Sequence, residues 1–359
     1  MARPLTVLLL VVASLWIACG DEPPPATPTP TAEVAASPTS LALPEATPTP
    51  ETTRTPTATP EPTASPEPAL LPIIDVHFHP DAAWNIEELV ALMDELGVVM
   101  AIGGAGDSGV EALRFTATYP DRFIPFAGQD GMRALNLIQG APSWELESVA
   151  AQDYVAGLEE QLQADCWAGI GEAFINTLGS HVSGGFSIPA DSPLMQRLLA
   201  LAAQYDAPLS VHMDAAPASV EELKTLLDSN PDGLLIWAHA GWYASPSQLR
   251  ELLQAHANLY IELSFRDELR SFFPVTSGGE LQENWRDLLE ELPDRFVLGT
   301  DLNPPPTPEK YSELVLLWRG VLEQLTAETA SMIGHENATR LVDETRVTDP
   351  GSCAARLAE

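Results

Sequence analysis

The sequence is poor in positive charge. It contains only two lysines, Lys224 and Lys310, and its 17 basic residues stand against 51 acidic ones, which gives a formal net charge of −34. A surface of this charge repels the phosphates of nucleic acids, so we expect no nucleic-acid partner. The charge indicates nothing specific about a substrate.

Cysteine is scarce as well. The three cysteines, Cys19, Cys166 and Cys353, fit neither the spacing of a thiolate metal site nor that of a disulfide framework. A bridge between Cys166 and Cys353 would require an oxidising compartment and suitable geometry, which the sequence does not reveal. We favour an unpaired, buried Cys166 and a Cys353 that lies on a C-terminal tail.

Long apolar runs are missing except for one near the N-terminus. Residues 5–18 are apolar, which is too short for a comfortable membrane span but suits the core of a signal peptide. The next residue is Cys19, and the junction resembles a bacterial lipobox, although Trp16 departs from that pattern. We predict that residues 1–18 are a signal peptide and that Cys19 is lipidated, which would anchor the protein to a membrane outside the cytoplasm. An ordinary secretory signal is the alternative.

Residues 19–71 show no apolar periodicity. Proline, threonine, alanine and glutamate dominate this segment, and proline removes backbone donors and favours extended geometry. Because such a composition cannot form a core, we predict a disordered linker that holds the rest of the chain away from the membrane. The remaining sequence divides into one large domain, residues 72–342, and a tail, residues 343–359.

The domain alternates short apolar runs with segments of helical periodicity, which favours βα units and a parallel sheet. We expect strands at 73–79, 98–103, 123–128, 168–174, 208–213, 234–239, 259–264 and 296–300. We expect helices at 86–96, 109–118, 144–163, 193–205, 220–229, 246–255, 284–291, 309–325 and 327–341. Two of them begin with a capping serine and a first-turn proline, at Ser192-Pro193 and Ser245-Pro246.

Eight such units indicate an α/β fold of the (β/α)8 TIM-barrel type. The alternative is an open doubly wound sheet, which would carry a glycine-rich phosphate loop after its first strand. The sequence has two histidines there instead, His77 and His79. Residues two apart in a strand point to the same face, so these two imidazoles project together.

Other polar residues also close apolar runs at the expected strand ends, namely Glu172, His212, His239 and Asp301. Active-site residues of a TIM barrel lie at these ends, and each group would be costly to bury without a partner. Histidine and carboxylate side chains are the ligands that zinc uses in catalytic sites. We therefore predict that the six residues form a site for a divalent metal, most plausibly zinc.

The sequence resembles the amidohydrolase superfamily over nearly all of residues 71–342. The resemblance rests on the motifs Asp75-Val76-His77-Phe78-His79, Gly171-Glu172, Val211-His212, Ala238-His239-Ala240-Gly241 and Gly299-Thr300-Asp301. The segment Ile333-Gly334-His335-Glu336-Asn337-Ala338 is similar to the terminal helix of the family. The nearest branch is amidohydrolase-2, which includes hydrolases and metal-dependent decarboxylases.

The resemblance implies a role for each residue. His77, His79 and Asp301 would bind a first metal, and His212 would join them or hold a second one. Many relatives carry a carboxylated lysine where this chain has Glu172, so the number of metals stays open. With two metals, Glu172 would bridge them and His212 and His239 would hold the second. With one metal, Glu172 and His239 would orient water or substrate.

The resemblance predicts an enzyme, a metal-dependent hydrolase whose activated water cleaves a C–N, C–O or P–O bond of a small molecule. Asp301 would accept the proton of that water and His239 would assist. Arg266, Arg133 and Trp242 follow strand ends and are candidate substrate contacts. A decarboxylase with the same ligands is the first alternative and would use one of these arginines. A non-catalytic envelope binding protein is the second, but it should have lost metal ligands.

Overall fold

The computed structural model describes residues 70–104, 109–137, 145–164, 166–176, 188–268, 270–302 and 306–342. The predicted signal peptide, residues 1–18, and the predicted tail, residues 343–359, lie outside these ranges, as do Cys19, Cys353 and all but the end of the linker 19–71. Those predictions stay predictions. Within the described ranges, no helix is both long enough and apolar enough to span a membrane.

Eight strands form one parallel sheet in which each strand pairs with the next, and β10 pairs with β7. The strands are β1 Ile73–Asp75, β2 Val98–Gly103, β3 Phe123–Gly128, β4 Gly169–Phe174, β5 Leu209–His212, β6 Leu235–Trp237, β7 Leu259–Glu262 and β10 Phe296–Val297. A separate hairpin, not predicted, consists of β8 Thr276–Ser277 and β9 Glu280–Leu281.

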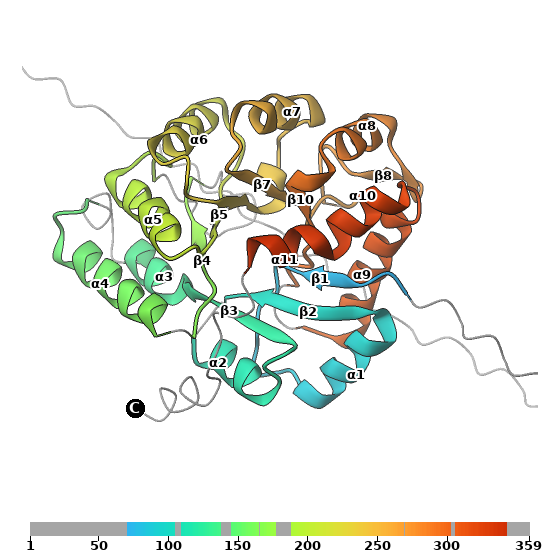
Figure 1. The fold of residues 1–359 in the computed structure, drawn as a ribbon, viewed down its shortest axis with the longest axis horizontal. Coiled ribbons are helices and arrows are strands. Elements are labelled where there is room, and N and C mark those ends of the chain that lie inside the picture. Colours follow the sequence, from blue (N-terminus) through green and yellow to red (C-terminus); the bar gives the residue numbers. More distant parts are fainter. Residues whose placement is uncertain are drawn as a thin grey trace, which may run out of the picture. The chain divides into compact units, whose positions relative to one another are not determined.

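The sheet curls, and its first and last strands approach each other (Figure 1). The backbone N–H of Val76 donates to the carbonyl of Leu298 at 2.8 Å, and the N–H of Asp301 donates to the carbonyl of His77 at 2.8 Å. These bonds join the segments that follow β1 and β10. The α/β fold with a curled, parallel, eight-stranded sheet is consistent with the predicted TIM barrel.

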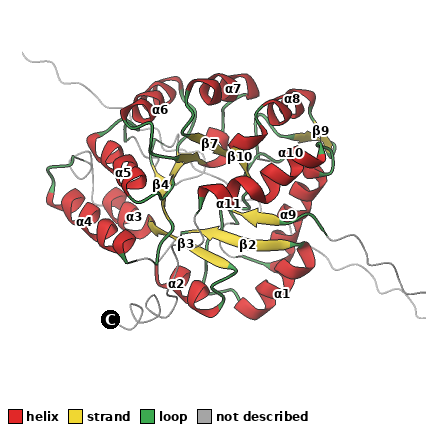
Figure 2. Ribbon diagram, in the orientation of Figure 1, coloured by secondary structure: helices red, strands yellow, loops and turns green. Residues whose placement is uncertain are grey.

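Helices connect the strands and lie around the sheet (Figure 2). They are α1 Ile86–Leu96, α2 Gly109–Thr118, α3 Gln129–Leu137, α4 Val149–Gln163, α5 Pro193–Gln204, α6 Pro217–Ser229, α7 Pro246–Ala255, α8 Glu283–Glu291, α9 Pro308–Leu322, α10 Ala327–Ser331 and α11 Asn337–Leu341. The predicted helix 144–163 is confirmed as α4, but α4 begins five residues later than predicted, after the capping residue Ser148. The predicted helix 327–341 contains a π-helical turn, Met332–Glu336.

The two serine caps predicted from the sequence are confirmed. The Ser192 side chain accepts a hydrogen bond from the Met195 N–H, and the Ser245 side chain accepts one from the Gln248 N–H. Each cap satisfies an N–H that has no partner within the helix, and the proline that follows needs no such partner. These signals fix where α5 and α7 begin.

The core has two layers because alternate strand residues face opposite sides of the sheet. Ile73 packs toward the helices, whereas Ile74 and Val76 join a smaller cluster on the inner side. That inner cluster also contains Ala338 and Leu341 of α11, which lies across the sheet in Figure 1. The amino ends of the strands are therefore covered by apolar residues, and the carboxyl ends carry the polar ones.

Cys166 corrects the sequence-based expectation. Its side chain is buried just before β4, as predicted, but it is disulfide-bonded rather than free. The bonded partner lies outside the described residues. A single sequence shows cysteine spacing but not the distance between distant segments, so pairing could not be read from it.

Candidate metal centre

Six polar side chains meet at the carboxyl ends of the strands. They come from the segments at the ends of β1, β4, β5, β6 and β10, and they are His77, His79, Glu172, His212, His239 and Asp301. All are buried except His79, whose side chain is 11% exposed. The structure thus brings together every residue that the sequence marked as a candidate ligand.

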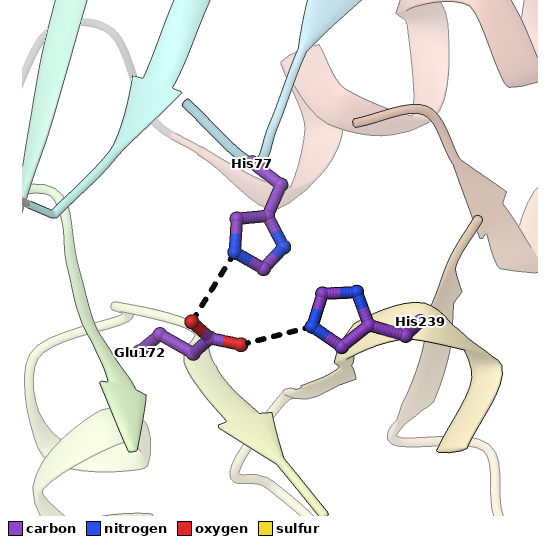
Figure 3. A group of neighbouring side chains, drawn as sticks. All are labelled: His77, Glu172 and His239. Carbon is purple, nitrogen blue, oxygen red and sulfur yellow. Dashed lines mark ion pairs between the residues drawn. The ribbon is translucent and has the colours of Figure 1, made fainter. Parts of the chain in front are cut away.

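Glu172 lies at the centre of the cluster, between His77 and His239 (Figure 3). Its Oε2 atom is 3.2 Å from His77 Nε2 and 3.9 Å from His79 Nε2. Its Oε1 atom is 3.0 Å from His212 Nδ1 and 3.3 Å from His239 Nε2. Each carboxylate oxygen therefore faces a different pair of imidazoles.

Asp301 connects the same two pairs from another side. Its Oδ1 atom lies 2.8 Å from His79 Nε2 and 3.5 Å from His77 Nε2, and its Oδ2 atom lies 3.6 Å from His239 Nε2. The backbone of Asp301 adopts a φ of 39°, a left-handed conformation that is unfavourable for a residue with a side chain. Such conformations concentrate at functional sites, where the surrounding structure enforces them.

The donor atoms fit a metal ion. Two groups of three residues place their ligand atoms within 4.8 Å of one another: His77 with Glu172 and His239, and His77 with His79 and Asp301. His77 Nε2 and Glu172 Oε2 are buried without a hydrogen-bond partner, a costly arrangement that a shared cation would relieve. Imidazole nitrogens and carboxylate oxygens are ligands of zinc and related divalent metals.

The carboxylates set the protonation of the cluster. Burial lowers the pKa of His77, but Glu172 and Asp301 outweigh it and hold the pKa well above its usual value. Burial also lowers the pKa of His79, but the hydrogen bond and charge of Asp301 outweigh this effect, so the pKa of His79 is raised. Burial raises the pKa of Glu172 and Asp301, but the neighbouring imidazoles dominate and both carboxyl pKa values fall below their usual range. Without metal, His77 and His79 are therefore the charged partners of the two carboxylates, whereas burial lowers the pKa of His239.

Zinc binding is expected to release protons at pH 7. His77 and His79 have raised pKa values, so they carry protons that a metal must displace before either imidazole can act as a ligand. We expect roughly one to two protons released per chain and an affinity that increases with pH until the pH exceeds those pKa values. Calorimetric titration with zinc in two buffers of different ionisation enthalpy measures the number of protons released per chain. A heat that is independent of the buffer would contradict the expectation.

Sequence analysis missed one buried carboxylate next to the ligands, Glu262 at the end of β7. Its Oε2 atom is 3.0 Å from His77 Nδ1 and accepts a hydrogen bond from the His239 N–H at 3.1 Å. The hydroxyl of Ser264 donates to Glu262 at 2.8 Å and lies 2.7 Å from His239 Nδ1. Glu262 and Ser264 thus orient the two imidazoles whose other nitrogens face Glu172. A carboxylate within an apolar run was the available signal, as it was for Glu172.

Replacing Glu262 with glutamine is expected to weaken zinc binding about 10- to 100-fold. The amide has only one acceptor oxygen, so its NH2 group would face either the Ser264 N–H or the donors from His77 and His239, and the imidazoles would lose their fixed orientation. Competition with a chelating indicator dye measures the affinity. The matched control is Glu283→Gln on the exposed start of α8, which should bind zinc like the unaltered protein. Equal affinity of both variants would contradict this role of Glu262.

A second buried carboxylate, Asp75, joins the segments that carry the ligands. It accepts hydrogen bonds from the Thr300 N–H at 2.9 Å, the Thr300 hydroxyl at 2.7 Å and the His77 N–H at 3.2 Å. Gly299 allows the segment after β10 to lie close to Glu262 and His77, because a Cβ atom at this position would collide with both side chains. Asp75 therefore fixes the spacing between the ligands that follow β1 and β10.

The three predicted substrate contacts have different positions. Arg266 is fully buried, and its guanidinium donates to the carbonyl oxygens of His239 and Ala240, so it is not the predicted clamp for a substrate carboxylate. Arg133 is exposed on α3 and belongs to neither group of candidate ligands. Trp242 is half-buried, with its ring centroid 6.1 Å from that of His239 and 4.8 Å from that of Phe265. Trp242 alone of the three remains beside the cluster with part of its side chain open to solvent.

Comparison with known proteins places these observations in context. A family model described as "Amidohydrolase" matches residues 74–343. A search of curated proteins found no match to the sequence.

Several solved structures are similar to the chain. The 4-oxalomesaconate hydratase from Rhodopseudomonas palustris is 14% identical, with a TM-score of 0.49, over 80% of this chain and 100% of that one. The 2,6-dihydroxybenzoate decarboxylase from Rhizobium is 16% identical, with a TM-score of 0.44, over 76% and 98%. The phosphotriesterase homology protein from Escherichia coli is 13% identical, with a TM-score of 0.46, over 76% and 99%.

Proposed function

Because the chain belongs to the amidohydrolase family, we propose that it is a metal-dependent hydrolase built on a (β/α)8 barrel. It would cleave a C–N, C–O or P–O bond of a small-molecule substrate. The observation that supports this proposal best is the convergence of four imidazoles and two carboxylates at the carboxyl ends of the strands, where TIM barrels carry their catalytic residues.

We propose that the centre holds two ions, most plausibly zinc. The two oxygens of Glu172 face separate pairs of imidazoles, His77 with His79 and His212 with His239. His77 and His79 would hold one divalent ion and His212 and His239 a second, with Glu172 contributing to both. Metal analysis of the purified protein measures the number of bound ions, and we expect about two equivalents per chain. A single equivalent would exclude a Glu172 that contributes to two ions.

A bound divalent ion lowers the pKa of water and polarises a carbonyl or phosphoryl oxygen. Asp301 would accept the proton from the attacking water and deliver it to the leaving group. The imidazoles keep its pKa below the usual range, so the carboxylate is ionised and able to accept a proton. Glu262 and Ser264 would keep the imidazoles of His77 and His239 in place during these steps.

Removal of the metal tests the proposal. We expect the protein stripped with a chelator to lose hydrolysis of every substrate that it accepts, and zinc to restore the activity. The substrates are a nitrophenyl ester, an aryl lactone, a nitroanilide and a nitrophenyl phosphodiester. Full activity of the metal-free protein would exclude the mechanism.

The position of Arg266 weakens one argument for a decarboxylase. Decarboxylation of an acid would need a cation to hold the substrate carboxylate, and Arg266 and Arg133 were the candidates for it. Arg266 is 0% exposed, and its guanidinium already donates hydrogen bonds to backbone carbonyls, so it is not available to bind a substrate carboxylate.

We further propose that the protein is exported and attached to a bacterial membrane through Cys19. The apolar run 5–18 before Cys19 and the proline-rich segment after it support this location. The disulfide at Cys166 supports it too, because disulfides persist in oxidising compartments. Labelled palmitate should enter the full chain but not the Cys19→Ser variant, and equal labelling would exclude the anchor.

A further inference from the structure

A cavity of about 650 Å³ lies beside the candidate metal centre. Asp301 is part of its wall, together with Leu302, residues of the loop that follows β7, and one face of α9. Its volume is within the range of small-molecule sites. Because Asp301 belongs both to the cavity wall and to the ligand cluster, the cavity adjoins the place where the proposed reaction occurs.

Helix α9 buries one apolar face completely in the core and places a second, partly buried face against the cavity. The core face carries the buried residues Tyr311, Val315, Trp318 and Leu322. The second face lines the cavity with Lys310, Leu314, Leu317 and Gly320, which repeat at intervals of three or four residues. Leu316, also in the wall, is 56% exposed. Leu314 and Leu317 are partly buried against the core, and the rest of their surface makes this wall of the cavity apolar, which suits an apolar ligand.

The shape of the cavity suits an extended chain. Lys310 and Gly320 are ten positions apart on α9, so the cavity follows the helix for ~15 Å. An extended aliphatic chain advances about 1.2 Å per carbon–carbon bond, so this length accommodates a chain of ten carbons or slightly more. Thr276 of β8 and Gly279 of the hairpin turn also line the cavity.

The charged groups of the cavity are mostly engaged with the protein. Asp267 pairs with Arg270, whose guanidinium also lies 4.0 Å above the ring of Phe265. The carboxylate of Glu268 accepts a hydrogen bond from the Gly279 N–H at 3.0 Å. Lys310 and Glu313 are exposed and form no ion pair within the described part of the chain, so their charges are open to the polar end of a ligand.

We infer that this cavity binds the acyl chain of the substrate and selects esters, lactones or amides with an aliphatic chain of about ten carbons. This inference rests on the proposed hydrolase function and names its substrate class. The carbonyl lies beside Asp301 and the chain extends along α9. In the reaction, the bond between the acyl carbon and the oxygen or nitrogen of the leaving group breaks. Water supplies the hydroxyl to the acyl carbon and the proton to the leaving group.

Binding of fatty acids tests the cavity without catalysis. Titration of the zinc-loaded full chain with butyrate and decanoate should give a Kd at least about 100-fold lower for decanoate, because each fully buried methylene contributes about fourfold. Decanol, a neutral chain of the same length, separates the contribution of the chain from that of the carboxylate. Equal Kd values for butyrate and decanoate would overturn the inference.

A glycine in the wall allows the cavity to be blocked. A Cβ atom built at Gly320 meets no atom within 4 Å, so Gly320→Leu should fold and place its side chain in the cavity. We expect this variant to bind decanoate at least about tenfold more weakly and butyrate as before. The control is Gly157→Leu on α4, which is equally open at Cβ but lines a different cavity. Unchanged decanoate binding in Gly320→Leu would overturn the inference.

Hydrolysis of nitrophenyl esters separates the cavity from the proposed activity. The zinc-loaded protein should have a higher kcat/KM for the decanoate ester than for the acetate ester. Gly320→Leu should remove that preference, and the control Gly157→Leu should keep it. If neither ester is hydrolysed while decanoate binding still depends on Gly320, the cavity is supported and ester hydrolysis is excluded. If both esters are hydrolysed without a preference for chain length, the cavity is not the acyl site.

Discussion

Replacing Asp301 with asparagine is expected to lower kcat/KM about 10³-fold for any substrate that the zinc-loaded protein hydrolyses. The amide resembles the carboxylate in shape but cannot accept a proton from the attacking water. It also weakens the electrostatic contact with His79, whose Nε2 atom lies 2.8 Å from Asp301 Oδ1. Steady-state kinetics of the zinc-loaded variant measures the loss, and zinc analysis of the same sample shows how much metal it retains.

The matched control is Asp287→Asn, the same chemical change on the exposed surface of α8. It should hydrolyse substrate at the rate of the unaltered protein. An Asp301→Asn variant that holds its zinc and keeps more than about a tenth of the activity would contradict the role of proton acceptor, because such groups contribute at least about 100-fold. Loss of both zinc and activity would instead identify Asp301 mainly as a ligand.

Much of the fold could be predicted because local signals agree with the tertiary structure. The bounds of α1, β2, α2, β3 and α7 match the prediction from periodicity and caps. The segment of α3 was missed because it contains Gly131 and Asn136, which have low helix propensity, and because it directly follows β3. The hairpin of β8 and β9 has two residues per strand, which is too short for a pattern to be visible.

The candidate ligands could be predicted because each one interrupts or ends an apolar run at the same edge of a parallel sheet. Their convergence follows from topology alone once the strand order is known. Glu262 could not be assigned in the same way, because its role depends on a 3.0 Å contact with His77, which is 185 positions away. Ligation by the six side chains remains a prediction that metal analysis will decide.

Arg266 shows where single-residue reasoning fails. Its position after a strand end suggested an exposed guanidinium, but the chain turns at Phe265, where φ is 58°, and directs Arg266 into the protein. There it donates to the carbonyl of His239 at 2.9 Å and to the carbonyl of Ala240. Both acceptor residues have left-handed backbone conformations, with φ values of 57° and 48°. Arg266 thus stabilises the strained turn that carries a candidate ligand.

Arg266→Met is therefore expected to destabilise the protein by about 3 kcal/mol or more. The change leaves the buried carbonyl oxygens of His239 and Ala240 without their charged donor. Each unsatisfied oxygen lowers the free energy of unfolding further. Burial lowers the pKa of Arg266 to about 9, with Glu262 opposing the shift, so the guanidinium is still charged at neutral pH and the full interaction is lost. Denaturant unfolding of the zinc-free variant measures the free energy.

An exposed arginine separates this role from a general effect of charge. Arg250 on α7 pairs with Glu291 at 2.7 Å, and its side chain is 30% exposed, so Arg250→Met should cost at most about 1 kcal/mol. Only Arg266→Met should also weaken zinc binding, because it frees the turn that places His239. If the two variants unfold at the same denaturant concentration and bind zinc equally well, the buried guanidinium does not hold the turn, and the position of His239 must be set by Glu262 and Ser264 alone.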